Sequence, residues 1–354
     1  MSFLGINMEK KVTIYDIARV VGVSAMTVTR AFKKGSKISE EKRREILSIA
    51  EKMKYIPNNA ASRLTAKAIR IGIIISNTVP EFTERLILGI NNAYKQLKDY
   101  KLNINIKVIE RNEGVSGYIS AINDFENAYC QGVIIMHGEY YLETIKKIEE
   151  IIQKGIFVTV VGNVYREHEL FNVSFNTVIA AKMACELLSN YLTERKNVVI
   201  FSASEEIPIH KSLVSSFLQE ADRRNVNILN IYYTENLPQI AKEKANCMLK
   251  NIHDVDGIYI DSANSVPIIE EIINNGLAHK IKIIASDIFP KMEEYIKSDV
   301  VSATIFQNQY LQSFTALINL FNYISANKTI EKSILITPEL IIKSNLEAYS
   351  DICF

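Results

Sequence analysis

From residue 70 onward, short apolar segments rich in β-branched residues alternate with longer amphipathic segments of helical period. Eight of the short segments are candidate strands: 70–76, 103–110, 132–137, 157–162, 197–202, 227–233, 257–261 and 282–285. Short β-branched strands separated by helices indicate parallel sheets that are covered by helices on both faces. Because the roughly 285 residues of this region exceed what one such sheet needs, we expect two lobes, each with its own sheet.

Charge is distributed unevenly along the chain. The whole sequence has a net charge of only +1, but residues 1–70 contain 15 lysines and arginines against 6 acidic residues. The remaining residues contain 26 basic and 34 acidic residues, so a small cationic region is joined to a mildly acidic body. Such asymmetry is typical of a nucleic-acid-binding module attached to another domain, although a basic face alone is often just a solvated surface.

The cationic region has the pattern of three short helices. Thr13 followed by Asp16 is a capping-box signature for a first helix. Gly22 then marks a turn, and Ser24 caps a second helix. A third helix is expected at about 39–53, with acidic residues near its start and lysines near its end, as the helix dipole favours. Two helices around a tight turn, backed by a third, predict a helix-turn-helix; a three-helix protein-binding domain is the alternative.

The second helix is the expected DNA-reading element. In a helix-turn-helix this helix enters the major groove, and residues near its N-terminus contact base edges. Helical spacing turns five side chains outward: Ala25, Met26, Thr27, Thr29 and Arg30. Arg30 can donate two hydrogen bonds to a guanine, while Ala25 and Met26 offer apolar contact to thymine methyl groups.

Residues 11–67 resemble, without a gap, the N-terminal domain of the lactose/galactose-repressor (LacI/GalR) family. The resemblance is carried by VTIYDIARVVGVSAMTVTRAF and by the following KISEEKRREILSIAEKMKYIPNNAASRL. It implies that positions 25, 26 and 30 read the bases. It also implies that six side chains hold the DNA backbone or nearby groups: Thr13, Tyr15, Ser24, Thr29, Ser39 and Tyr55.

A hinge that folds into a short helix on DNA is part of the same resemblance. The segment NNAASRLTA at 58–66 matches it, with Asn58 and Ser62 as further DNA contacts. Leu64 matches the family's apolar wedge, which opens a base step through the minor groove; the alternative is an ordinary linker residue. Because such hinges work in pairs, the resemblance implies a homodimer on a pseudo-palindromic double-stranded DNA operator.

Polar residues follow the predicted strands of the body. In open α/β sheets a ligand sits beyond the carboxyl ends of the strands, so these residues are candidates for a pocket. They are Asn77, Glu110, His137 and Asn163 in the first lobe, and Ser204, Asp261, Ser262 and Asp287 in the second. Each alone could be a cap or a loop residue. Together they predict a neutral-polar to acidic cleft that suits a ligand rich in hydroxyl groups.

The body resembles the periplasmic-binding-protein-like core of the same family, less closely than the N-terminal region does. The resemblance implies ligand contacts by Asp287, which would accept hydrogen bonds from sugar hydroxyls, by Gln307 and by His210. Other family positions differ: Leu213 stands where many members have an arginine, and Asn176 and the pair Ser262-Ala263 replace the usual Asp-containing pairs. These differences favour a different ligand over a loss of effector control.

These features divide the chain into parts. We expect a disordered tail at 1–9, a helix-turn-helix DNA-binding domain at 10–57, a hinge helix and linker at 58–69, and an effector-binding core at 70–354. Lobe 1 is expected at about 70–172 and 307–336, and lobe 2 at about 173–306 and 337–354. The expected fold is an all-α N-terminal domain followed by a two-lobed α/β core with parallel sheets of the periplasmic-binding-protein type.

Several classes of function lack sequence support. No GxSxG, Walker, HExxH or GxGxxG motif occurs, so we expect no enzyme and no catalytic residues. The five histidines and four cysteines lack metal-ligand spacing, and we expect neither a metal nor a cofactor. The apolar runs are too short to span a membrane, and the first residues lack a secretory pattern. We therefore expect a cytoplasmic protein that is associated with the nucleoid when bound to its operator.

The leading hypothesis is a repressor of carbohydrate-utilisation genes. A sugar-like effector between the lobes would control operator affinity. One alternative is the same regulator controlled by a protein partner or carrying a degenerate pocket. Another is a stand-alone solute-binding protein, against which the basic N-terminal region argues.

Overall fold

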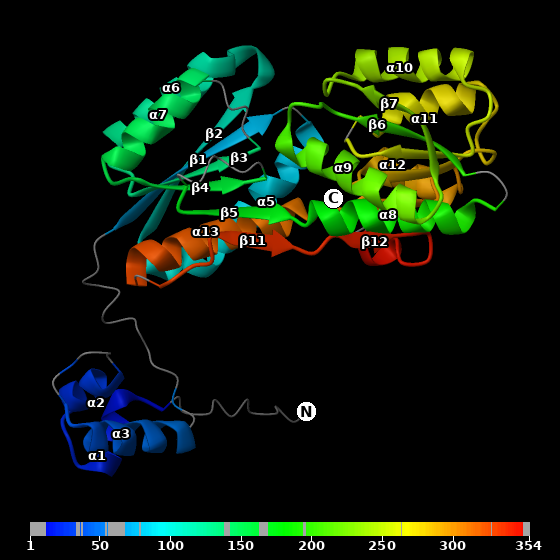
Figure 1. Cartoon of the computed structure of the whole chain (residues 1–354). Coiled ribbons are helices and arrows are strands. Elements are labelled where there is room, and N and C mark those ends of the chain that lie inside the picture. The colour runs from blue at the N-terminus through cyan, green and yellow to red at the C-terminus, as the bar shows by residue number, and fades with distance from the viewer. Residues whose placement is uncertain are drawn as a thin grey trace, which may run out of the picture. The chain divides into compact units, whose positions relative to one another are not determined.

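The computed structural model consists of two compact units, residues 1–67 and residues 68–354 (Figure 1). The residues that it describes are 12–32, 36, 38–53, 55, 68–77, 79–137, 142–162, 169–193, 196–262, 264–326 and 328–349. The two units are called here the N-terminal unit and the core unit.

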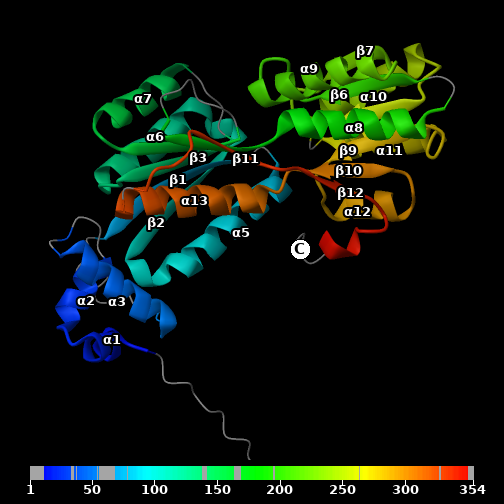
Figure 2. The ribbon, with the colours of Figure 1, turned by 60° about the horizontal axis from the view of Figure 1, so that its bottom comes forward.

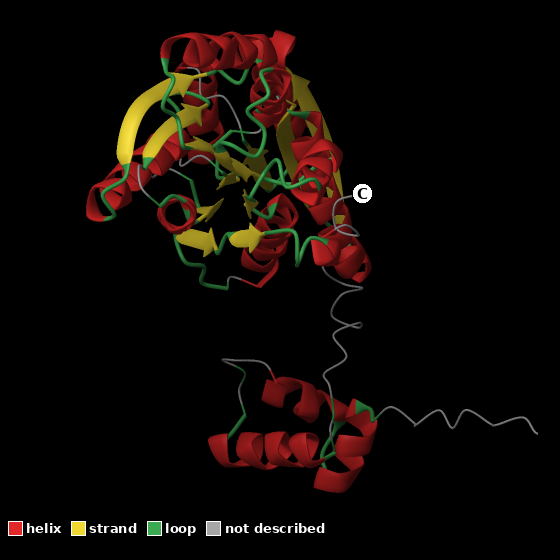
Figure 3. Ribbon diagram, turned by 90° about the vertical axis from the view of Figure 1, so that its right-hand side faces the viewer, coloured by secondary structure: helices red, strands yellow, loops and turns green. Residues whose placement is uncertain are grey.

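The described part of the N-terminal unit is built of helices (Figure 3). They are α1 (Ile14–Val21), α2 (Ala25–Phe32) and α3 (Glu40–Lys52). The predicted capping box between Thr13 and Asp16 is confirmed, and Gly22 ends α1 with a φ of 70°, which glycine adopts without steric cost. Ile17, Val28 and Ile46, one from each helix, are fully buried and form the centre of the unit.

The first lobe of the core unit contains a six-stranded sheet in which all described pairs are parallel. The strand order is β11 (Ser333–Ile336), β5 (Phe171–Phe175), β4 (Phe157–Val161), β3 (Gly132–Met136), β1 (Ile69–Asn77) and β2 (Leu102–Glu110). Helices α5 (Pro80–Leu97) and α13 (Gln309–Ala326) pack on one face, and α6 (Gly114–Asn127) and α7 (Leu142–Gln153) on the other. Two 3₁₀ turns, η1 (Lys98–Tyr100) and η2 (Arg111–Glu113), flank β2.

The second lobe has a matching six-stranded sheet, in which β12 alone of the described strands is antiparallel to its neighbour. The order is β12 (Glu339–Ile341), β10 (Ala303–Phe306), β9 (Lys282–Ser286), β8 (Gly257–Ile260), β6 (Asn197–Ser202) and β7 (Asn227–Tyr233). Helices α10 (Pro238–Asn251), α11 (Ser265–Asn274) and α12 (Pro290–Lys297) cover one face, and α8 (Thr177–Tyr191) and α9 (Pro208–Arg223) the other.

The chain passes between the lobes at three places in the core unit (Figure 2). These are Asn176 between β5 and α8, residues 307–308 between β10 and α13, and residues 337–338 between β11 and β12. The expected lobe boundary at 173 is wrong, because it falls inside β5, which pairs with β4 and β11 of the first lobe. The expected hinge end at 69 also requires correction, since Ile69 is already the first residue of β1.

All eight predicted strands are present, each within one residue at either end. The sequence pattern missed β5, β10, β11 and β12. Strands β5 and β10 contain polar residues that are buried through hydrogen bonds, such as Ser333 Oγ to Asn172 Oδ1 (3.0 Å) and Thr304 Oγ1 to the Asp287 carbonyl (2.6 Å). Strands β11 and β12 have three or four residues at sheet edges, too few for a clear pattern.

Among the described residues, no helix has both the length and the apolar character that crossing a bilayer requires.

The contact between α5 and α13 depends on Gly89. A β-carbon at this position would lie 2.1 Å from Ser313 Oγ and 2.3 Å from the Tyr310 carbonyl oxygen. Gly89→Ala should therefore lower the free energy of unfolding by about 1–3 kcal/mol, because overpacking outweighs the gain in helix propensity. Urea denaturation followed by circular dichroism measures the change. Asn91→Ala on the exposed side of α5 is the control, and equal or higher stability of Gly89→Ala would contradict the packing argument.

Candidate nucleic-acid interface and interlobe cleft

Helix α2 presents a mixed apolar and cationic surface. Val28 and Ala31 are buried against the other helices, so the helical period turns Met26, Thr29 and Arg30 outward. Met26 is 65% exposed, so its apolar side chain is accessible to a partner. Ala25 and Thr27 are partly exposed.

Hydrogen bonds within α2 occupy several of the other candidate groups. The Ser24 and Thr27 hydroxyls are 2.9 Å apart, and the Thr27 N–H donates to Ser24 Oγ at 3.1 Å. Thr29 Oγ1 donates to the Ala25 carbonyl at 3.0 Å. These contacts fix the start of the helix, and they leave Met26 and Arg30 as the long side chains that can reach a base.

The predicted DNA-backbone contacts divide into exposed and structural groups. Tyr15 is 68% exposed, and Ser39 is exposed while it caps α3 by accepting the Lys42 N–H at 3.3 Å. The Thr13 hydroxyl donates to Asp16 at 2.6 Å, and Tyr55 packs against Phe32 with ring centroids 5.6 Å apart. Three further predicted contacts lie outside the described residues: Asn58, Ser62 and Leu64.

In the first lobe, Asn77 and His137 lie at the carboxyl ends of β1 and β3. Asn77 Nδ2 donates to both carboxylate oxygens of Glu110 at 2.9 and 3.0 Å, which joins the ends of β1 and β2. Asn77 Oδ1 and His137 Nε2 are buried and have no hydrogen-bond partner in the part of the chain that the structure describes.

The His137 ring is held by packing. It makes an edge contact with Phe82, with centroids 4.6 Å apart, and a β-carbon at Gly162 would lie 2.6 Å from the ring. The backbone of His137 has a φ of 50°. Burial, with a smaller contribution from the charge of His210, lowers the pKa of His137 to about 4. The imidazole is therefore neutral at pH 7 and can donate or accept one hydrogen bond at Nε2, depending on its tautomer.

The second lobe places a polar cluster at the end of β8. His210 Nδ1 lies 2.8 Å from Asp261 Oδ1, and Asp261 is fully buried. Four neighbouring atoms are buried without a partner among the described residues: Asp261 Oδ2, Ser262 Oγ, Asn264 Nδ2 and Ser265 Oγ. Each such atom costs about 1–3 kcal/mol unless it is satisfied, so their concentration at one strand end points to a polar ligand or bound water.

Asp287, at the end of β9, has its partners within the chain. It accepts hydrogen bonds from the Gln307 N–H (3.2 Å), Gln307 Nε2 (2.9 Å) and Gln309 Nε2 (2.7 Å). Burial raises the pKa of its carboxyl to about 6, against the opposing effects of these donors and of Arg85. Asp287 and Gln307 are thus brought together, and Asp287 ties the end of β9 to a segment that crosses between the lobes.

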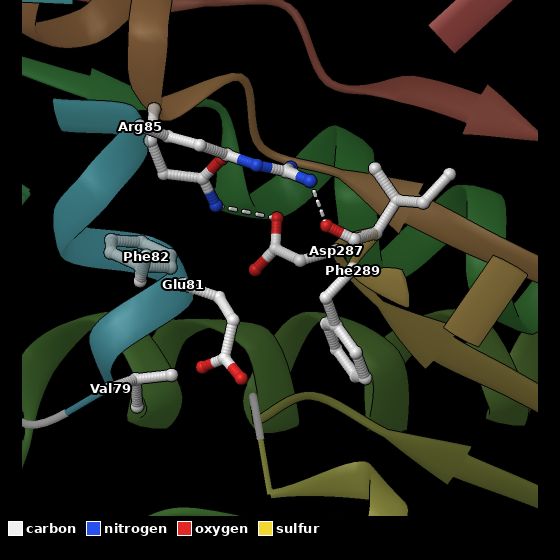
Figure 4. A pocket seen from close by; sticks show the side chains of 8 residues that line it. Val79, Glu81, Phe82, Arg85, Asp287 and Phe289 are labelled. Carbon is white, nitrogen blue, oxygen red and sulfur yellow. Dashed lines mark hydrogen bonds between the residues drawn. The ribbon is translucent and has the colours of Figure 1, made fainter. Parts of the chain in front are cut away.

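A small cavity lies between the lobes beside Asp287. Its lining residues are Val79, Glu81, Phe82, Arg85, Asp287, Ile288, Phe289 and Gln309 (Figure 4). The volume open to the centre of a water molecule is about 10 Å³, room for about one water. A sugar can therefore enter here only if the lobes move apart.

Arg85 is the main cavity residue that the sequence pattern missed. It is only 6% exposed, donates to the Ile288 carbonyl of the other lobe, and lies over the Phe306 ring at 5.4 Å. A signal was present, since Arg85 falls three residues after Phe82 and four before Gly89, on the apolar face of α5. A charged residue at a core-facing helical position requires a specific partner.

Other predicted pocket residues have local roles. Ser204 Oγ accepts the Glu206 N–H at 3.2 Å. Asn176 caps α8 by accepting the Ile179 N–H at 3.1 Å, and Leu213 is buried in the core of the second lobe. Asn163 and Ala263 lie outside the described residues. In the described part of the chain, no group of three or more His, Cys, Asp or Glu residues is arranged to hold a metal ion.

Both units match known protein families. Residues 71–328 match the periplasmic binding protein domain, and residues 13–58 match the bacterial regulatory proteins of the lacI family. The chain belongs to the lacI family of regulators with a periplasmic-binding-protein core. This confirms the predicted family and the predicted fold class.

One curated relative of this lacI-family chain is catabolite control protein A of Streptococcus mutans. The two are 28% identical over 186 residues, which cover 52% of this chain and 54% of the relative. The chain spans about half the length of the curated relatives it matches.

Solved structures show the same architecture. The lac repressor dimer bound to operator and the anti-inducer ONPF aligns with a TM-score of 0.65 at 17% identity, covering 94% of this chain and 98% of that one. GanP, a glucose-galactose binding protein from Geobacillus stearothermophilus, aligns with a TM-score of 0.70 at 19% identity, covering 79% of this chain and 99% of that one. At these identities the likeness concerns the fold alone.

The raised pKa of Asp287 predicts a pH dependence of stability. Between pH 4 and pH 6 the folded protein keeps a proton on Asp287 that the unfolded chain has lost, so this carboxyl contributes less stability as the pH rises. From pH 4.5 to pH 7 the wild type should lose about 2 kcal/mol relative to Asp287→Asn, which does not titrate.

Urea denaturation at both pH values gives the comparison. For each protein, the change in the free energy of unfolding between the two pH values is compared. The absolute values are not used, because the amide nitrogen introduced by Asp287→Asn faces the donors of Gln307 and Gln309 and lowers stability at both pH values. Asp222→Asn, at an exposed position on α9, should follow the wild type. Parallel pH profiles for wild type and Asp287→Asn would show that Asp287 is already ionised at pH 4.5.

Proposed function

We propose that this protein is a sequence-specific DNA-binding repressor of carbohydrate-utilisation genes, controlled by a sugar-like effector that binds between the lobes. The observation that carries the proposal is the set of buried, unpartnered polar atoms at strand ends of both lobes. It occurs in a chain whose other unit exposes Met26 and Arg30 on the second helix of a lacI-type domain.

The buried, unpartnered polar atoms at the strand ends of both lobes fit hydroxyl groups. Asp261 Oδ2 and Asn77 Oδ1 require a donor, Asn264 Nδ2 requires an acceptor, and the Ser262 hydroxyl and His137 Nε2 can serve either way. A hydroxyl both donates and accepts, so a polyhydroxylated ligand can satisfy all of them. Phe82 and Phe289 add apolar surface for the carbon face of such a ligand.

The N-terminal unit supplies the DNA-binding half of the proposal. Arg30 would donate to a guanine and Met26 would contact a thymine methyl, with two protomers binding the halves of a pseudo-palindromic operator in the cytoplasm. Effector and operator must alter each other's affinity by the same factor, because coupling between two sites is reciprocal.

Ligand binding is tested by thermal denaturation of the full chain with hexoses, pentoses, polyols, sugar phosphates and sugar acids. One class should raise the melting temperature by several degrees, because a ligand that binds only the folded state stabilises it. Ser262→Ala should reduce the shift, since it removes a buried, unpartnered hydroxyl near the end of β8. Ser298→Ala, at an exposed position of the second lobe, is the control. The absence of a shift with any compound would count against a sugar-type effector and favour control by a protein partner.

Base reading is tested with Arg30→Ala and an operator selected from random DNA. The variant should lose about 1–3 kcal/mol per half-site and lose discrimination at one base pair. Fluorescence anisotropy at fixed salt against single-base operator variants measures both quantities. Arg44→Ala, exposed on α3, should keep the base preference. If Arg30→Ala weakens binding equally on all sequences, Arg30 contacts a phosphate and does not read a base.

A further inference from the structure

Two arginines of the first lobe donate hydrogen bonds to backbone carbonyls of the second lobe. Arg85 extends from α5 to the Ile288 carbonyl, just after β9. Arg111, in η2 after β2, donates to the carbonyls of Glu235 and Asn236, between β7 and α10. Both contacts join the carboxyl ends of strands in one lobe to those in the other.

Arg85 depends on the second lobe for its described partners. Its guanidinium is buried, contacts the Ile288 carbonyl and interacts electrostatically with Asp287 (Figure 4). It also lies over the Phe306 ring. Each of these three residues lies in the second lobe. Separation of the lobes would remove all of these contacts at once, and the charge would then need water or a ligand as a partner.

Arg111 forms a two-pronged contact at the outer strands β2 and β7. Its two terminal nitrogens donate at 3.1 Å to the Asn236 carbonyl and at 3.0 Å to the Glu235 carbonyl. Hydrogen bonds hold the start of η2, next to Arg111. The Glu110 N–H donates to Glu113 at 2.7 Å, and the Glu110 carboxylate accepts from Asn77 Nδ2. Arg111 is exposed, so its contribution is smaller than that of Arg85.

The accepting segments of the second lobe have an unusual backbone. Glu235 and Asn236 have φ values of 52° and 51°, and Asp287, which precedes Ile288, has a φ of 64°. This left-handed conformation is unfavourable for Glu235, whereas asparagine and aspartate adopt it more readily. Both arginines therefore bind at turns of the second lobe with left-handed backbone.

We propose that Arg85 and Arg111 form an interlobe latch, a built-in device that sets how readily the cleft opens. Because the cavity beside Asp287 has room for only about one water, entry of a larger ligand requires the latch to open. A bound ligand then competes with the latch or takes over its donors. The consequence for effector binding rests on the function proposed above, whereas the latch itself does not.

The latch is tested by measuring the distance between the lobes in the full chain. Spin labels are attached at Lys146→Cys on α7 and Lys244→Cys on α10, two exposed positions on helices of different lobes (Figure 1). Cys247→Ser removes the exposed thiol of α10, and Cys353→Ser removes the thiol near the end of the sequence. Double electron–electron resonance should give one dominant short distance for the latched protein. Arg85→Met should raise a longer-distance population by roughly tenfold, and Arg111→Met should raise it by less.

Matched controls separate the latch from a general loss of an arginine. Arg224 binds Glu220 (2.6 Å) and Glu186 (3.0 Å) within the second lobe, so Arg224→Met should leave the distance distribution unchanged. Arg85→Lys, which keeps the charge but not the fork of donors, should give an intermediate result. A wild-type distribution in a folded Arg85→Met variant would overturn the proposal.

If Arg85→Met does not fold, the exposed Arg111 decides the question. An Arg111→Met distribution identical to that of the wild type would then also overturn the latch. The experiment uses neither effector nor DNA. Its outcome is therefore independent of whether the protein binds a sugar or represses a gene.

Discussion

Buried polar groups must find hydrogen-bond partners, and this constraint governs how the carboxyl ends of the two sheets are arranged. Parallel strands bring those ends together at one edge of each sheet, where the chain must leave each strand and turn into a helix. Asp287 meets the requirement through three donors, two from Gln307 in the segment that crosses between the lobes and one from Gln309 at the start of α13. Arg85 meets it through the Ile288 carbonyl of the other lobe.

The same constraint separates two parts of the interlobe region. Asp287 and Arg85 have partners within the chain, so they join the lobes to each other, although the neighbouring Gln309 Oε1 is buried without a partner among the described residues. At the strand ends that carry His137, Asp261 and Ser262, several buried atoms have no partner among the described residues, and a polar ligand or water would satisfy them. The family resemblance implied that Asp287 accepts hydrogen bonds from sugar hydroxyls. In the structure it instead accepts hydrogen bonds from Gln307 and Gln309, which helps to join the lobes. Its three described acceptor contacts leave little capacity for a ligand unless the lobes rearrange.

The sequence predicted the strands with a continuous or alternating apolar pattern. It missed β5 and β10, whose polar residues bond to other segments, and the short edge strands β11 and β12. In β5, Asn172 Oδ1 accepts a hydrogen bond from Ser333, which lies in a strand about 160 residues later, a pairing that no local pattern contains. The lobe boundary was misplaced for the same reason, since β5 belongs to the first lobe through its pairing with β11. The candidate ligand residues at strand ends could be predicted, because a residue that directly follows a parallel strand lies at the carboxyl edge of the sheet. Arg85 and Gln309 lie on helices, and their role follows only from which lobe faces them.

The choice of arginine at position 85 bears on how the cleft works. A buried charged group usually stabilises a fold less than a well-packed apolar side chain of similar volume, because desolvation of the charge offsets its attractive contacts. An apolar residue on this face of α5 would hold the lobes by contact area alone, and a polar ligand could not replace that contact. A guanidinium requires hydrogen-bond acceptors in the closed form and can accept substitutes from water or a hydroxylated ligand in the open form. The closed and open forms can therefore lie close in free energy, which is the condition under which a small ligand shifts a population.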